Sequence, residues 1–184
     1  MGGDPLRRLE EALAPLVGAL AAAVAAAGGL VLLALMVLTC VSITGRALLP
    51  LGLGPVPGDF ELVELGAAFV VFSFLPWCQY RRGHVSVDLL IGAFGPRAMA
   101  LAATAGNLLL TLAFALIAWR LWEGLFDKLR FGQSSFILAV PVWWAYAASV
   151  PGAVLAVAVS LFTALRSLNE LRGAGEPAAL ASGE

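Results

Sequence analysis

The chain has 184 residues, of which 61% are hydrophobic and only 12% are charged, and its formal net charge is −1 at pH 7. Soluble domains carry about a quarter charged residues, so this composition argues against a soluble globular protein. The absence of a basic patch argues against nucleic acid as a partner. The charged residues form short clusters, which leaves uncharged stretches at 12–45, 65–80, 98–119 and 131–165.

These stretches predict four transmembrane helices, because roughly 20 helical residues cross a hydrocarbon core about 30 Å thick. We expect spans near 18–44, 61–80, 97–120 and 137–164. They are apolar on every side, whereas the helices of a soluble core have a polar face. The predicted fold class is all-α integral membrane, with a single four-helix membrane domain over residues 1–172 and a disordered tail over 173–184.

Two shorter segments are predicted to lie at the membrane interface. Residues 4–16 have Asp4 as a helix cap, Pro5 at the first helical position and leucines along one side, which is typical of a short interfacial helix. The stretch HVSVDLLIGAFGP, which begins at His84, is too short to span and is expected to lie along the cytoplasmic interface. Pro96 then suits the start of the third helix.

The positive-inside rule orders the loops. With four spans both termini share one side. That side carries Arg7, Arg8, Arg81, Arg82, Arg97, Arg166 and Arg172. The other side carries Arg46, Arg120, Lys128 and Arg130. This asymmetry predicts that both termini are cytoplasmic.

Polar chemistry is concentrated at the end of the second predicted span and just beyond it, in QYRRGHVSVD. Arg81 and Arg82 would complement the negative end of that helix and the anionic leaflet, and Gly83 suits the position that ends it. His84 is the only histidine and has no partners for a catalytic triad. His84 and Asp88 are also too few ligands for a structural zinc site. We therefore predict no enzymatic activity, no metal and no cofactor.

The remaining polar candidates lie at or within the spans. Glu61 and Glu64 share a face at the start of the second helix, where they would lie in headgroups or pair with a cation such as Arg46. Asn107 is the only amide expected near mid-bilayer and would bond to a neighbouring helix. Pro151 is expected to kink the fourth span, with Ser149 satisfying part of the freed backbone.

Two segments carry a resemblance to a known family. Residues 58–90, GDFELVELGAAFVVFSFLPWCQYRRGHVSVDLL, contain an acid pair at membrane entry and then the element R-x-G-H-V-x-V-D. The segment FILAVPVWWAYAASVPGAVL has Pro141, Trp143, Trp144 and Pro151 as further markers. Both resemble the small membrane subunit of tripartite ATP-independent periplasmic (TRAP) transporters. Phe60 stands where the family more often has a tryptophan.

The resemblance implies an accessory subunit in the bacterial inner membrane. Its partners would be a large membrane subunit that carries the sodium and substrate sites, a periplasmic substrate-binding protein, and membrane lipids. The chain would support the large subunit and offer a docking surface during sodium-coupled uptake of an organic acid. An alternative from a different class is a self-sufficient, proton-coupled small exporter that acts as a homo-oligomer, for which Glu64 would be the titratable group.

Overall fold

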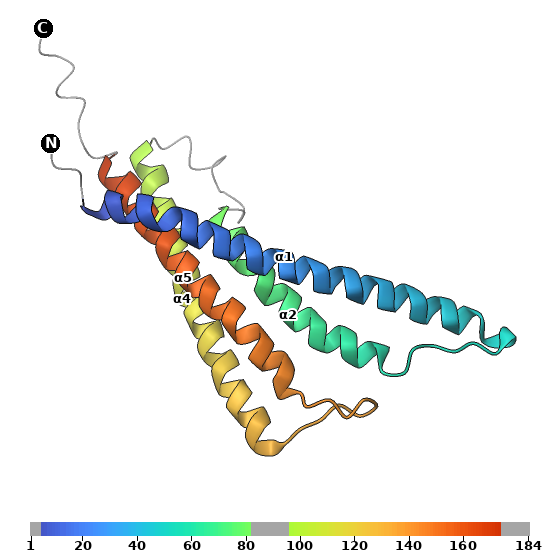
Figure 1. Ribbon diagram of the computed structural model, residues 1–184. Coiled ribbons are helices and arrows are strands. Elements are labelled where there is room, and N and C mark those ends of the chain that lie inside the picture. The colour runs from blue at the N-terminus through green and yellow to red at the C-terminus, as the bar shows by residue number, and fades with distance from the viewer. Residues whose placement is uncertain (1–4, 82–95, 174–184) are drawn as a thin grey trace, which may run out of the picture.

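The computed structural model describes residues 5–81 and 96–173, which are helical apart from their turns and loops (Figure 1). The long helices are α1 (Pro5–Ala47), α2 (Asp59–Tyr80), α4 (Pro96–Phe131) and α5 (Trp143–Gly173). A short 3-10 helix, η1 (Leu49–Leu51), follows α1. The described residues contain no β-strand.

Four segments of these helices are long and apolar enough to cross a membrane. They are Ala12–Ala47, Asp59–Tyr80, Thr104–Phe131 and Trp143–Leu168. The prediction of an all-α membrane protein with four spanning helices is therefore confirmed.

The separate interfacial helix expected over residues 4–16 is not observed, because α1 continues without a break from Pro5 into the first span. Pro15 lies inside this helix and does not end it. The residues that follow Pro15 are mostly alanine and leucine, which are among the strongest helix formers. With 43 residues, α1 is about 65 Å long, roughly twice the thickness of a hydrocarbon core.

The last span begins later than predicted, at Trp143 instead of residue 137. Residues 132–142 form a hairpin-like loop, in which the Val142 amide donates to the Gln133 carbonyl at 3.0 Å and the Ser135 amide donates to the Val140 carbonyl at 2.9 Å. The third helix begins at Pro96, as expected. The predicted cytoplasmic segment lies outside the described residues, as does the predicted tail beyond Gly173.

The helices are arranged in the spatial order α1, α2, α5, α4 and do not form a closed bundle. α5 packs against both α2 and α4, and α1 packs mainly on α2. By contrast, no described Cα atom of α2 comes within 8 Å of one in α4. Half of the α5 span is consequently buried inside the molecule, against 11% of the α1 span and 6% of the α4 span. Small residues make this possible: a Cβ atom on Gly152 of α5 would lie only 2.5 Å from the Phe72 carbonyl oxygen of α2.

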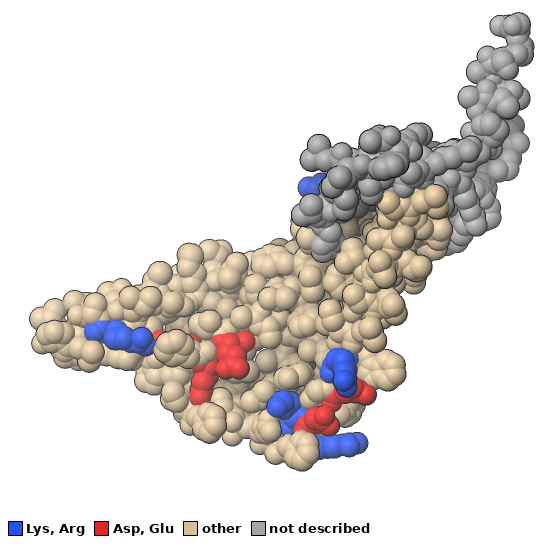
Figure 2. All heavy atoms as spheres, turned by 180° about the vertical axis from the view of Figure 1, so that it is seen from behind, with Lys and Arg blue, Asp and Glu red and all other residues tan. Residues whose placement is uncertain are grey.

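The two ends of the molecule differ in shape and charge. We call the end that carries η1 and residues 132–142 the loop end, and the opposite end the termini end. The α1–α2 and α4–α5 hairpins lie close together at the termini end and diverge toward the loop end (Figure 1). The acidic and basic side chains visible from behind gather mainly at the loop end, and the surface between the ends is uncharged (Figure 2).

Candidate functional site

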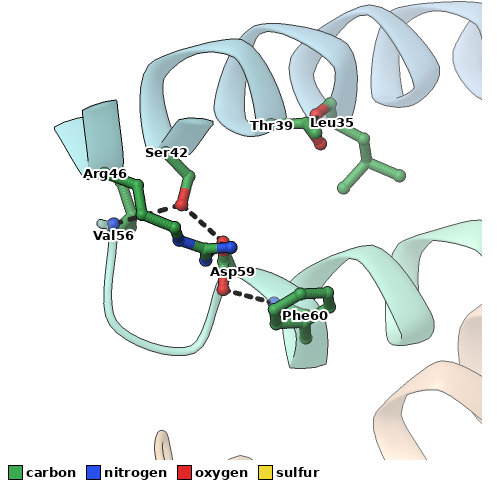
Figure 3. A network of polar contacts seen from close by, with 7 residues as sticks. All are labelled: Leu35, Thr39, Ser42, Arg46, Val56, Asp59 and Phe60. Atoms are coloured by element: carbon green, nitrogen blue, oxygen red, sulfur yellow. Dashed lines mark hydrogen bonds and ion pairs between the residues drawn. The ribbon is translucent and has the colours of Figure 1, made fainter. Parts of the chain in front are cut away.

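An ion pair at the loop end joins the end of α1 to the start of α2 (Figure 3). The Arg46 guanidinium lies 3.2 Å from Asp59 Oδ2, and the buried Ser42 hydroxyl donates a short hydrogen bond to the same oxygen. The Asp59 Oδ1 atom accepts the Phe60 amide at 2.9 Å, and the Arg46 guanidinium lies 5.6 Å from the centroid of the Phe60 ring. The Val56 amide donates to Ser42 Oγ at 3.3 Å, so the loop between the two helices is attached to the same cluster.

Glu61 connects α2 to the α4–α5 loop. The Ile137 amide donates to Glu61 Oε1 at 2.7 Å, and the Leu138 amide donates to Glu61 Oε2 at 2.9 Å. Leu138 also packs against Gly58, where a Cβ atom would lie 2.4 Å from the leucine Cγ. Gly58 has φ +75°, a conformation that glycine adopts without steric cost. A single carboxylate therefore holds the loop against the first turn of α2, across the opening between the hairpins.

A buried polar network joins α2, α4 and α5 toward the termini end. Gln79, which is 1% exposed, donates from Nε2 to Thr163 Oγ1 at 2.8 Å and to Asn107 Oδ1 at 3.3 Å. The Asn107 Nδ2 group donates to Ser167 Oγ at 2.6 Å. The network places no charge in the membrane, and it fixes the relative positions of three helices. The Gln79 Oε1 atom is buried and has no hydrogen-bond partner.

Aromatic contacts close the termini end of α2. The Arg81 guanidinium lies 5.0 Å from the centroid of the Trp77 ring, and the Arg81 amide donates to the Trp77 carbonyl at 3.0 Å. The Tyr80 ring stacks between those of Trp77 and Phe162, with centroid distances of 6.0 and 6.4 Å. The Tyr80 hydroxyl donates to the Ala14 carbonyl at 3.2 Å, which attaches α1 at this end.

A comparison with known families matches residues 35–170 to tripartite ATP-independent periplasmic transporters, DctQ component. This range covers about three quarters of the 184 residues and contains most of the contacts described above. The chain belongs to the DctQ family. This DctQ component is thus a small membrane subunit of a transporter, and its family is not one of enzymes. No curated protein and no solved structure matches the chain.

The structure changes the predicted partners of the acidic residues of this DctQ component. Arg46 pairs with Asp59, and neither Glu61 nor Glu64 takes part in that pair. The reason is that Asp59 is the first residue of α2 and lies closest to the end of α1, whereas Glu61 is engaged by the α4–α5 loop. Glu64 is exposed and makes no hydrogen bond or ion pair with any described residue.

Trp143, Trp144 and Pro151 of the predicted last span lie in α5, whereas Pro141 lies in the loop two residues before it. The Pro141 carbonyl accepts the Trp144 amide at 3.1 Å, and the Trp143 and Trp144 rings meet edge to face at a centroid distance of 6.1 Å. Pro151 lies inside a helix that continues through it. The Ser149 hydroxyl donates to the Ala145 carbonyl at 2.7 Å, so it does not bind the carbonyl of residue 147 that Pro151 leaves free.

Four of the predicted candidates, Arg82, Gly83, His84 and Asp88, lie outside the described residues. Conversely, sequence reasoning missed Ser42, Asp59, Gln79, Thr163 and Ser167 as partners in polar contacts. A usable signal existed for two of them. Thr163 and Ser167 are one helical turn apart in an otherwise apolar span, so their hydroxyls share a face. Among the described residues, no group of three or more His, Cys, Asp and Glu side chains is placed to hold a metal ion.

Proposed function

We propose that this DctQ component is a scaffold that braces the large membrane subunit of a TRAP transporter and conducts no solute itself. The complete transporter would take up an organic acid in a sodium-coupled manner, with the sites for both on the large subunit. In this proposal the chain lies in the bacterial inner membrane with both termini in the cytoplasm. The domain would comprise all four spanning helices as a single structural unit.

The arrangement of the helices in a row is the observation that carries the proposal. Only α5 is largely enclosed by its neighbours, so the outward faces of α1 and α4 remain uncovered. On α4 these faces carry exposed leucines, including Leu108, Leu109, Leu112 and Leu116. In a membrane, apolar faces of this breadth suit contact with lipid or with another membrane subunit. The described spans contain no Asp, Glu, Lys, Arg or His between 65 and 80, 104 and 119, or 143 and 165, so they offer no charged path for a solute.

The loop end supports the second part of the proposal, in which a periplasmic binding protein docks on this surface. In the view from behind, acidic and basic side chains gather at this end (Figure 2). The Glu61 contacts and the Arg46–Asp59 pair fix the loops that present this surface. A fixed surface loses little conformational freedom when a partner binds, which favours association.

Co-purification and reconstitution test the proposal together. The tagged chain is expressed with the large membrane subunit of its transporter, and we expect the two to elute as one complex after mild solubilisation. In proteoliposomes, the complex with its binding protein should import an organic acid when a sodium gradient is applied. The chain reconstituted alone should show no flux. Flux through the isolated chain, with a proton dependence that Glu64→Gln removes, would instead establish the exporter.

A further inference from the structure

A cavity opens at the loop end where the two hairpins diverge. It has a volume of about 330 Å³ and is lined by residues of three helices, among them Glu64 and Ala68 of α2, Leu121 and Lys128 of α4, and Ala145 of α5. A second cavity of about 460 Å³ adjoins it and shares Glu64, Leu65 and Val142 in its lining. These volumes are in the range of sites for small ligands. Since no Cα atoms of α2 and α4 come within 8 Å of each other, the space between them at the loop end is not closed by a backbone contact.

The walls of this cavity carry two opposite charges that the described chain leaves unpaired. Glu64 is exposed on α2 and has no hydrogen-bond or ion-pair partner among the described residues. Lys128 on α4 donates from Nζ to Gln133 Oε1 at 2.6 Å but has no described carboxylate within 4.0 Å. The one other acid that lines the two cavities, Glu61, is engaged by two amides. An occupant that satisfies both walls must carry a cationic donor and an anion.

The lining changes from polar to apolar along the helix axes. Glu61, Glu64, Lys128 and Gln133 lie nearest the loop end. Ala68 lies one turn further along α2 than Glu64, and Leu121 lies two turns, or about 10 Å, from Lys128 toward the middle of α4. This order is that of a lipid monolayer, in which headgroups lie outermost and acyl chains point to the membrane centre.

We propose that this wedge between α2, α4 and α5 binds one phospholipid with a primary-amine headgroup, such as phosphatidylethanolamine. Its ammonium group donates to the Glu64 carboxylate, its phosphate pairs with Lys128, and one acyl chain lies against Ala68, Leu121 and Ala145. A choline headgroup has no N–H to donate to Glu64, and an anionic headgroup without an amine would be repelled by Glu61 and Glu64. The charges of the wedge therefore select the amine.

Photolabelling with a lipid probe tests the proposal. The full chain, with any membrane subunit that co-purifies, is reconstituted in phosphatidylcholine vesicles that contain a trace of phosphatidylethanolamine with a diazirine in its acyl chain. After illumination, mass spectrometry should locate the label at residues 65–68, 121 and 145–149. Unlabelled phosphatidylethanolamine should compete for the label, whereas added phosphatidylglycerol should not.

A matched pair of double variants separates specific binding from general lipid contact. Glu64→Gln with Lys128→Gln should reduce labelling of the wedge about tenfold, the effect of losing roughly two charge-assisted hydrogen bonds at a partly exposed site. The control variant, Glu123→Gln with Arg130→Gln, also removes one negative and one positive charge near the loop end. Both of its residues lie outside the wedge, so labelling should be unchanged. Gel filtration and thermal unfolding check that both variants fold.

Three results would overturn the proposal. Label spread evenly over the outward faces of α1 and α4 would show ordinary annular lipid. Equal labelling of the wedge by a phosphatidylcholine probe with the same diazirine chain, which can be measured on the unaltered protein, would exclude recognition of the amine. Wedge residues that crosslink to the large subunit, and not to lipid, would show that a protein segment fills the site.

Discussion

Three carboxylates lie within the first two turns of α2, yet each has a different environment. Asp59 binds Arg46 and Ser42 of α1, Glu61 binds two amides of the α4–α5 loop, and Glu64 has no partner among the described residues. Helical spacing alone places Glu61 and Glu64 on one face and cannot distinguish them. Their roles diverge because the loop, which is distant in sequence, reaches only the first of them.

The two amide contacts of Glu61 lead to a prediction at the level of single residues. In Glu61→Gln, one carboxylate oxygen is replaced by an NH₂ group, which cannot accept from an amide. We expect the Ile137 and Leu138 amides to exchange with deuterium several times faster, since their opening no longer breaks a charge-assisted pair of bonds. Hydrogen exchange with mass spectrometry measures this. Glu64→Gln is the matched control, and equal exchange in both variants would contradict the assignment.

The buried network gives a second prediction. In Thr163→Val the side-chain volume is retained, but Gln79 Nε2 loses its acceptor at 2.8 Å and keeps only Asn107 at 3.3 Å. We expect a loss of about 0.6 to 1.7 kcal/mol in unfolding free energy, the range for hydrogen bonds between membrane helices. The Ser160 hydroxyl donates only to the Val157 carbonyl of its own helix, so Ser160→Ala should have little effect. Steric-trap unfolding in bicelles compares the two, and equal losses would argue that the network does not link helices.

At the scale of elements, α5 owes its central place to a face of small residues. Ala153, Ala156, Val159 and Ala164 are buried, and Gly152 lets the backbone of α2 approach closely. A helix with larger side chains on this face could not pack against α2 and α4 at once. The polar residues of α5 use the same face, because Ser149, Ser160, Thr163 and Ser167 are small enough to be enclosed.

This packing predicts opposite outcomes for two glycine substitutions. Gly152→Ala would place a methyl group 2.5 Å from the Phe72 carbonyl oxygen, so the helices must separate, at a cost of about 1–3 kcal/mol. Gly106→Ala on α4 meets no atom within 4 Å and should be neutral or slightly stabilising. Thermal unfolding of the purified variants tests both expectations. A neutral Gly152→Ala would mean that α2 and α5 are further apart than described.

The elements were easier to predict than their partners. Continuous apolar length determined the four spans, because the membrane demands it regardless of neighbours. The prediction that a separate interfacial helix ends at residue 16 was wrong, because α1 continues through Pro15 into the first span. The start of the last span was misplaced because Gln133 and Val142 pair across the loop, and such pairing leaves no local signal in an apolar sequence. Gln79 was missed because its burial depends on contacts with Asn107 of α4 and Thr163 of α5, which are distant in sequence.

At the scale of the whole molecule, the length of α1 constrains how the protein lies in a membrane. Its spanning segment, Ala12–Ala47, has 36 residues and is about 54 Å long. Crossing about 30 Å of hydrocarbon with all of it would require a tilt above 50°, beyond the range of about 0–40° seen for membrane helices. Part of α1 must therefore project beyond the hydrocarbon core. At the loop end, the charged Arg46–Asp59 pair suits a position among headgroups.

The orientation proposed for the molecule yields the last prediction. In a variant with Cys40→Ser and Cys78→Ser, single cysteines are introduced by Gly54→Cys or Ser134→Cys at the loop end, or by Gly2→Cys near the N-terminus. Four spans place both loops on one side and both termini on the other, and the distribution of arginine and lysine puts the loops outside. An impermeant maleimide added to spheroplasts should label residues 54 and 134 and should label residue 2 only after lysis. The reverse labelling pattern would show the opposite orientation in the membrane. The loop end would then lie on the cytoplasmic side, where a periplasmic partner could not reach it.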